Sequence, residues 1–241
     1  GPPPTPQAPV ATAATTTNEL PPAPEYAGTP PAYDPPPAQD YGNVPMQVNY
    51  FYSSLSPYGS WVELPNFGWC WQPTTVAIDP GWRPYCHRGS WMYSNCGWYW
   101  HSDYSWGWAP FHYGRGYDHP RCGWVWFPEL TWAPAWVSWR YTDTHCGWAP
   151  LPPGAHCGPS GWSYHGSSVG VGFGFGLGAA HFNFVSYKDF GGRYPQHHAL
   201  KGPYAHTVYT KSKPINDIVM GENNTIINKG VGYERVAAVS R

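Results

Sequence analysis

The sequence predicts an all-β protein: an antiparallel meander of short Trp-rich hairpin repeats, barrel-like or sandwich-like, with an extended Pro-rich N-terminal arm. All sixteen tryptophans fall between Trp61 and Trp162. A Gly-Trp phrase recurs there at spacings of 29, 26 and 24 residues, which is typical of stacked supersecondary units. Gly or Pro stands every few residues, and no apolar stripe of helical spacing is sustained. The repeats are counted from Trp69, Trp98, Trp124 and Trp148.

The first 45 residues form the predicted arm. Fourteen of the 30 prolines precede Gln47, and no Lys or Arg occurs before that point. Such a segment favours extended polyproline geometry and has little apolar surface to bury. It is interpreted as a spacer, as a stalk glycosylated at Thr15, Thr16 and Thr17, or as an arm that docks on a neighbouring subunit.

The second predicted region, residues 46–187, is the Trp/Gly/Cys-rich β domain. Residues 48–61 alternate aromatic and polar side chains and then break at Pro57 and Gly59, which predicts a strand and a turn. In each following Gly-Trp-x-Trp phrase the glycine suits a turn, and the two indoles share one strand face. Because Leu, Ile and Val are sparse between residues 61 and 165, indole and phenol rings must supply the core.

Glycine alternates with apolar residues from Ser168 to Gly178, which predicts a strand with one bare face. Residues 181–187 predict a second alternating strand. The third region, residues 188–241, is expected to be a polar loop to residue 214, followed by a β-prone tail. The Ile-rich and Asn-rich stretch of that tail, residues 223–236, is expected to pair with another strand or chain.

The charge balance and hydropathy limit the partners. Thirteen basic residues against fourteen acidic ones give a net charge of −1, which argues against nucleic acid as a partner. No run of 18 apolar residues is present, so we expect no membrane-spanning helix. No apolar signal segment stands at the start, so an exported protein would already have lost it.

The cysteine set is even and confined to the Trp-rich stretch, which predicts disulfides in an oxidising compartment. Fifteen connectivities are open, and buried reduced thiols are the alternative. The six residues are Cys70, Cys86, Cys96, Cys122, Cys146 and Cys157.

Catalytic and metal chemistry find little support in the sequence. Asp103 and Glu129 follow successive Gly-Trp-x-Trp phrases, but turn carboxylates are the commoner interpretation. Ser168 is central in a Gly-x-Ser-x-Gly match, yet no helix follows it. Histidine neighbours of cysteines, such as His145, point to the opposite strand face and do not suit zinc. We therefore expect no catalytic residues, no metal and no cofactor.

Aromatic residues and arginines cluster in the second half of the β domain. They are predicted either to clamp the layers together or to form an exposed platform for sugar rings or a partner's prolines. The platform candidates are Trp106, Trp108, His112, Tyr113, Arg115, Trp132, Trp136, Trp139 and Arg140.

Four phrases, at residues 82–85, 106–115, 132–140 and 147–153, resemble an uncharacterised Trp-rich bacterial family of extracytoplasmic proteins, some of which carry FecR-type modules. The resemblance runs from about Tyr50 to Tyr187, and the tail is also similar. It implies a periplasmic, outer-surface or secreted location and brings no known reaction. The cysteines depart from the family's pattern.

Together these observations predict a non-catalytic structural or scaffolding subunit of a bacterial cell-envelope or extracellular assembly, such as a filament or surface complex. Its partners are expected to be other copies of itself or other envelope proteins. The alternative is a glycan- or cell-wall-binding module that uses exposed tryptophans.

Overall fold

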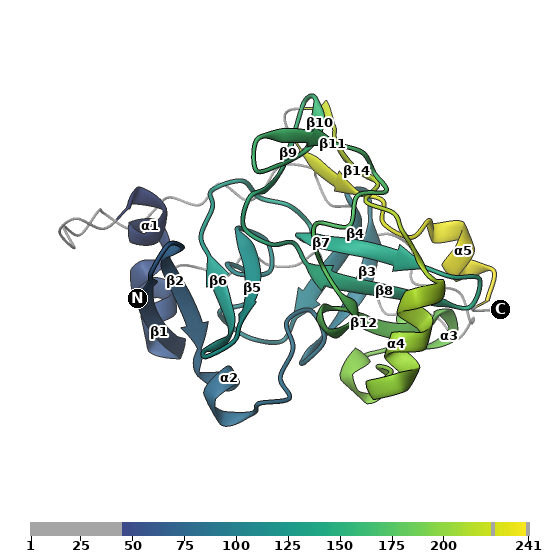
Figure 1. The fold of residues 1–241 in the computed structure, drawn as a ribbon, viewed down its shortest axis with the longest axis horizontal. Helices are drawn as coiled ribbons and strands as arrows, with labels where there is room; N and C mark the ends of the chain where they lie inside the picture. Colours follow the sequence, from purple (N-terminus) through teal and green to yellow (C-terminus); the bar gives the residue numbers. More distant parts are fainter. Residues whose placement is uncertain (1–44, 223–224, 240–241) are drawn as a thin grey trace.

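The structure is a computed structural model that describes residues 45–222 and 225–239. The Pro-rich arm with Thr15, Thr16 and Thr17 lies outside the described residues. Most of the described elements are strands in antiparallel sheets, with few helices, so the all-β prediction is confirmed (Figure 1).

Four sheets make up the described fold. The first has the strand order β1 (Gly59–Leu64), β2 (Gly68–Pro73), β6 (Gly123–Phe127), β5 (Arg115–His119). The second is β14 (Ile218–Met220), β15 (Ile226–Asn228), β4 (Gly97–Ser102), β3 (Gly89–Ser94). The third is β12 (Asn183–Ser186), β8 (His145–Pro150), β7 (Val137–Tyr141), β13 (Lys213–Pro214), and the fourth is β11 (Ser167–Val169), β10 (Gly161–Tyr164), β9 (Ala155–Gly158). None of these sheets closes on itself, so the barrel option is wrong for the described residues.

The Gly-Trp hairpins are present as predicted. β1 pairs with β2, β3 with β4, and β5 with β6, all antiparallel. Gly68, Gly97 and Gly123 each enter the second strand with a positive φ, between 68° and 83°. Other residues adopt that conformation at a cost, which explains why glycine precedes the first Trp of these repeats.

The predicted strand that begins at Val48 is wrong, because residues 46–55 form helix α1 (Met46–Leu55). Val48, Phe51 and Leu55 are its main buried side chains. They are spaced i, i+3, i+7, the apolar stripe of a helix, and the aromatic-polar alternation hid this stripe. Phe51 packs against Trp126 of β6 with ring centroids 5.0 Å apart, so α1 covers the first sheet.

The glycine-alternating segment is not the predicted strand beyond Val169. Phe173 N–H donates to the Gly170 carbonyl and Leu177 N–H to the Gly174 carbonyl, so successive tight turns replace extended backbone. Val171 is exposed whereas Phe175 is buried, so the apolar side chains do not share one face. Glycine at every second position adopts turn conformations without steric strain, so the backbone favours turns over a strand here.

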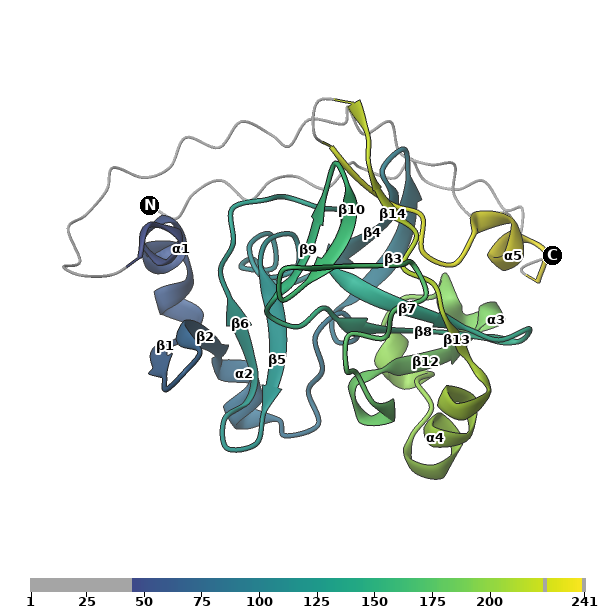
Figure 2. The same cartoon turned by 45° about the horizontal axis from the view of Figure 1, so that its top comes forward.

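The region after residue 187 is more ordered than the expected loop and tail. It contains α3 (Tyr187–Phe190), α4 (Gly202–Lys211) and α5 (Tyr233–Ala237), besides the short helix α2 (Thr74–Ile78) earlier in the chain. The β-prone tail does pair: β15 lies between β14 and β4, antiparallel to the first and parallel to the second. Figure 2 shows α4 beside β12 and α5 at the end of the third sheet away from α1.

Indole rings build the core, as the sequence predicts. Of the sixteen tryptophans, only Trp61 and Trp69 are not buried, and each of these is partly covered. The main cluster joins rings from α1, such as Phe51, to rings from α3, such as Phe190, and to Val236 of α5. This aromatic cluster joins the first three sheets, whereas the fourth sheet belongs to a second cluster with Trp136 and Trp162.

Candidate functional site

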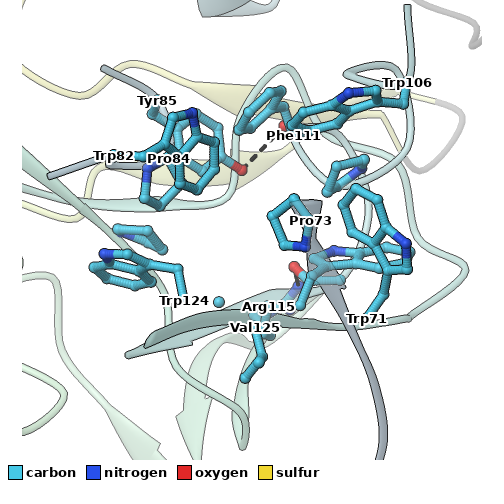
Figure 3. Close-up of a pocket in the computed structure, with 15 residues that line it drawn as sticks. Trp71, Pro73, Trp82, Pro84, Tyr85, Trp106, Phe111, Arg115, Trp124 and Val125 are labelled. Carbon is cyan, nitrogen blue, oxygen red and sulfur yellow. Dashed lines mark hydrogen bonds between the residues drawn. The ribbon is translucent and has the colours of Figure 1, made fainter. Parts of the chain in front are cut away.

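An aromatic cavity lies where the first sheet meets two loops (Figure 3). Strands β2, β5 and β6 form one side, and residues 82–85 and 106–114 form the other. Its walls are almost entirely carbon. The lining residues are Trp71, Pro73, Trp82, Pro84, Tyr85, Trp106, Pro110, Phe111, Gly114, Arg115, Gly116, Trp124, Val125, Trp126 and Pro150.

Hydrogen bonds to backbone carbonyls fix the rings of this cavity. Tyr85 O–H donates to the Phe111 carbonyl at 3.0 Å, the bond drawn in Figure 3, and Trp126 Nε1–H donates to the Tyr113 carbonyl at 2.6 Å. Burial raises the pKa of the Tyr85 phenol well above its ordinary value. The phenol therefore stays protonated and remains a donor.

The cavity is too small for a sugar or a nucleobase. It offers about 30 Å³. A water molecule needs roughly 10 to 15 Å³ of such space, and a cavity of about 150 Å³ accepts a benzene ring. The cavity therefore has room for about two waters, and its packed rings serve cohesion.

Arg115 is the charged group beside this cavity, and its side chain is 2% exposed. Its Nε–H donates to the Ala155 carbonyl at 2.6 Å, and its guanidinium lies 3.9 Å from the centre of a Trp136 ring. One Nη atom is 3.4 Å from a carboxylate oxygen of Glu129. Burial lowers the pKa of Arg115 while Glu129 opposes this, and arginine remains charged in either case. Arg115 thus clamps β5 to the third sheet and to β9.

The predicted exposed platform is absent at the tryptophans and their neighbours. Eight of its nine residues are 8% exposed or less, so ring faces are not available to a sugar. The ninth, Arg140, donates to the Ser212 hydroxyl and carbonyl and stacks 4.3 Å from the Tyr209 ring centre. Arg115 and Arg140 therefore fit the other interpretation, in which arginines hold the layers together. The eight are Trp106, Trp108, His112, Tyr113, Arg115, Trp132, Trp136 and Trp139.

His112 is buried between two aromatic rings. Its ring lies 4.7 Å from Tyr99 and 5.7 Å from Trp132, nearly parallel to both. Its Nδ1 is 2.9 Å from the Ala133 carbonyl, which places the proton of the neutral ring on Nδ1. Burial lowers the pKa of His112 to about 4. The residue is a neutral spacer in a stack and lacks the exposure of a general base.

The six cysteines are free thiols, so the predicted disulfide set is not found. They act as small apolar side chains: Cys70 packs with Leu64 and Val125, whereas Cys96 and Cys146 belong to the main core. Burial raises the pKa of the Cys70 and Cys86 thiols to about 12. The reduced, buried alternative fits the structure. The full set is Cys70, Cys86, Cys96, Cys122, Cys146 and Cys157.

The carboxylate pair considered from the sequence is divided between two ion-pair networks. Asp103 lies 3.7 Å from His101 and 3.5 Å from Arg193, whereas Glu129 faces Arg115 and His156. Ser168 is an exposed residue of β11, paired with Ser163, and the turns of the glycine segment follow it. Within residues 45–222 and 225–239, no cluster of three or more metal-ligating side chains occurs.

Tyr85 and Arg83 are structural residues that the sequence did not single out. Tyr85 has a positive φ of 54° and accepts the Trp136 N–H at its hydroxyl, 3.2 Å away. Arg83 holds residues of a segment about 100 positions later. Their segment, residues 82–85, resembles the family described above, and this resemblance is the sequence signal that points to it.

A comparison with curated proteins found no match, and a comparison with solved structures found none either. A third found that residues 52–155 match a family of unknown function, DUF6600. The matched segment begins in α1 and ends at the start of β9, so it contains the first sheet and the β3–β4 and β7–β8 hairpins. No helix of the described chain is both long and apolar enough to cross a bilayer.

Proposed function

We propose that this chain is a non-catalytic structural subunit of a bacterial cell-envelope or extracellular assembly. The observation that carries the proposal is the use of indoles as internal fasteners. Trp71 Nε1–H donates to the Leu55 carbonyl, Trp148 Nε1–H to the Tyr85 carbonyl, and Trp162 Nε1–H to the Asn216 carbonyl. The three bonds join residues that are 16, 63 and 54 positions apart in sequence. A part fastened in this way suits bearing load and presenting fixed surfaces.

The outer strands give such a subunit a route to neighbours. β1 has a partner strand on one side only and ends the first sheet. An edge strand can pair with another chain. Exposed apolar side chains lie close to it: Phe67 follows β1 in its hairpin turn, and Ile78 projects from α2, which contacts β1 and β2. We therefore place the contact between copies on this end of the first sheet.

Glycan or cell-wall binding has less support, because it needs indole faces in solvent. The two partly covered indoles are Trp61 and Trp69. Trp61 is stacked against Tyr52 at 5.7 Å, so one of its faces is occupied.

Sedimentation velocity of the full chain tests the assembly role. We expect concentration-dependent oligomers of the native chain, and Ile78→Lys should weaken self-association at least about tenfold, because a buried charge at a contact is costly. Val239→Lys, which changes another exposed apolar side chain away from the first sheet, is the matched control and should leave association unchanged. A chain that stays monomeric at every concentration, alone and with envelope extract, contradicts the proposal. Fractionation of the producing cells tests the location.

A further inference from the structure

A second, open pocket of about 770 Å³ lies beside the aromatic cavity, since residues of the segment 81–87 line both. It is formed by residues 81–87, the segment that leads into β12, and the residues around the start of α4. Figures 1 and 2 show α4 packed beside β12, which brings these segments together. A pocket of this size can hold a small organic molecule, unlike the closed aromatic cavity.

The pocket carries basic side chains and no carboxylate. Arg83, Lys201 and three histidines, His87, His197 and His206, line it, and neither Asp nor Glu is among its lining residues. In a chain with a net charge of −1, this is a local excess of positive charge. An anion would be attracted to it.

Neutral groups hold the Arg83 guanidinium in place. Its Nε–H donates to Asn183 Oδ1 at 2.6 Å, and Nη2–H donates to the Ala180 carbonyl at 2.7 Å. The buried amide of Asn183 is itself oriented, since its Nδ2 donates to the Pro84 carbonyl. These bonds engage two of the five guanidinium N–H groups, and the end formed by Nη1 and Nη2 keeps donors for an oxyanion.

The Arg83 guanidinium interacts electrostatically with Asp118, but the two do not form an ion pair. Among the residues that the structure describes, no ion pair involves Arg83 or Lys201. Arg83 is only partly exposed, and burial lowers its pKa, although arginine stays charged. A partly desolvated charge whose hydrogen-bond partners are all neutral carries an energetic penalty that a bound anion would offset.

Further polar groups in the wall suit a ligand with hydroxyl groups. His87 Nδ1 lies 3.0 Å from the Arg83 backbone nitrogen and 3.3 Å from the Arg83 carbonyl oxygen, so the ring tautomer decides whether Nε2 donates to a ligand or accepts from one. The Gln196 side-chain oxygen is buried without a hydrogen-bond partner. Phe182 and Leu200 supply apolar wall for the body of a ligand.

We propose that this pocket binds the anionic group, phosphate or carboxylate, of a small organic molecule, with the Arg83 guanidinium as its main anchor and Lys201 as a second cation. The proposed role of this pocket is ligand binding and not catalysis. The Cys86 thiol in its wall has a pKa raised to about 12 by burial and is a poor nucleophile. The proposal does not depend on the assembly role.

Isothermal titration of the full chain tests the proposal with four probes: inorganic phosphate, glucose 6-phosphate, glucuronate and glucose. We expect saturable binding of at least one charged probe and none of glucose. Phosphate and carboxylate sources are distinguished by whether glucose 6-phosphate or glucuronate binds more tightly. Arg83→Lys keeps the positive charge but loses the planar guanidinium, which can donate two parallel hydrogen bonds to an oxyanion. This variant should weaken binding about tenfold.

Lys201→Ala should weaken the same binding roughly threefold or more, because an exposed cation contributes less. Lys188→Ala, an exposed lysine on α3 outside the pocket, is the matched control and should leave affinity unchanged. If Arg83→Lys does not fold, judged by circular dichroism, the Lys201 and Lys188 variants decide. The proposal is overturned if no charged probe binds, if glucose binds equally well, or if Lys188→Ala weakens binding as much as Lys201→Ala.

Discussion

At the scale of single residues, side chains with reactive groups are used as packing material. Cys146 and His112 are both buried within the aromatic core, and burial shifts the pKa of each toward the neutral form. Desolvation disfavours a thiolate and an imidazolium alike, which is why both shifts have the same cause. Residue type alone therefore gave poor guidance to chemistry.

Thiol titration tests the free cysteines. In the native protein, Cys122 and Cys157 should react first with a thiol reagent, because the other four side chains are buried. In denaturant without reductant, all six should react. The control is a sample reduced before denaturation, which should give the same total. A lower total in the unreduced sample would mean that disulfides exist.

His112 predicts a loss of stability in mild acid. Its pKa is about 4 in the folded chain, below the roughly 6.5 of an unfolded histidine. Between these values the unfolded chain binds more protons, so stability falls as pH drops from 6.5 to 4 and is unaffected by this group above 6.5. The shift corresponds to a loss of up to about 3 kcal/mol. Urea unfolding at a series of pH values measures it.

His112→Phe is the matched control for that prediction, because it keeps a ring in the stack but cannot titrate. Burial also lowers the pKa of His87 and His145, which contribute in the same direction in both proteins. The difference between the two pH profiles therefore isolates His112. Identical slopes for the native protein and the variant would contradict the prediction.

At the scale of elements, the hairpins were predictable and several other segments were not. The Gly-Trp phrases place a left-handed glycine and same-face indoles together, and both features are local. Helix α1 has its apolar stripe at Val48, Phe51 and Leu55, but four of its ten residues are aromatic or β-branched, a composition that favours a strand. Tertiary packing on Trp126 decided the outcome.

The parallel contact between β15 and β4 could not be predicted, because it joins residues more than 120 positions apart. It consists of Asn228 against Gly97, where the Asn228 N–H donates to the Cys96 carbonyl at 2.8 Å. Asn228 also accepts the indole N–H of Trp139 at 2.8 Å. An Asn in a β-prone tail suggests a turn, whereas here it joins two sheets.

A glycine pair tests that contact. Gly97→Ala should destabilise the protein by at least about 2 kcal/mol, because its new Cβ would lie 1.9 Å from the Asn228 carbonyl oxygen, besides the strain of a φ of 82°. Gly68→Ala has the same strain at a φ of 83° but nothing within 4 Å, so about 1 kcal/mol is expected. Equal losses in urea unfolding would mean that the β15–β4 contact contributes nothing.

At the scale of the whole molecule, the aromatic core was predictable from composition. The burial of the residues predicted to form a binding platform follows from that core. With few aliphatic residues in the Trp-rich stretch, folding must place indoles inside, which removes them from solvent. The same rings cannot both fill a core and present a surface. The basic pocket was not predictable, because Arg83 and Lys201 are brought together only by the packing of α4 on β12.

The shared core predicts that the described domain unfolds as one cooperative unit. Rings from α1, the Gly-Trp hairpins and α3 lie in one cluster with Val236 of α5, and the fourth sheet shares a second cluster with Trp136, so opening a sheet exposes indoles of its neighbours. Tryptophan fluorescence and far-ultraviolet circular dichroism should therefore give the same urea midpoint and slope. Native emission should be blue-shifted and resist acrylamide quenching, since nearly all indoles are buried.

A matched pair of variants tests this cooperativity. Trp139→Phe removes a fully buried indole that bonds to Asn228, whereas Trp61→Phe changes a partly exposed one. Trp139→Phe should lower both midpoints together and by more, whereas separated transitions for the two probes would show that the tail folds apart from the hairpins.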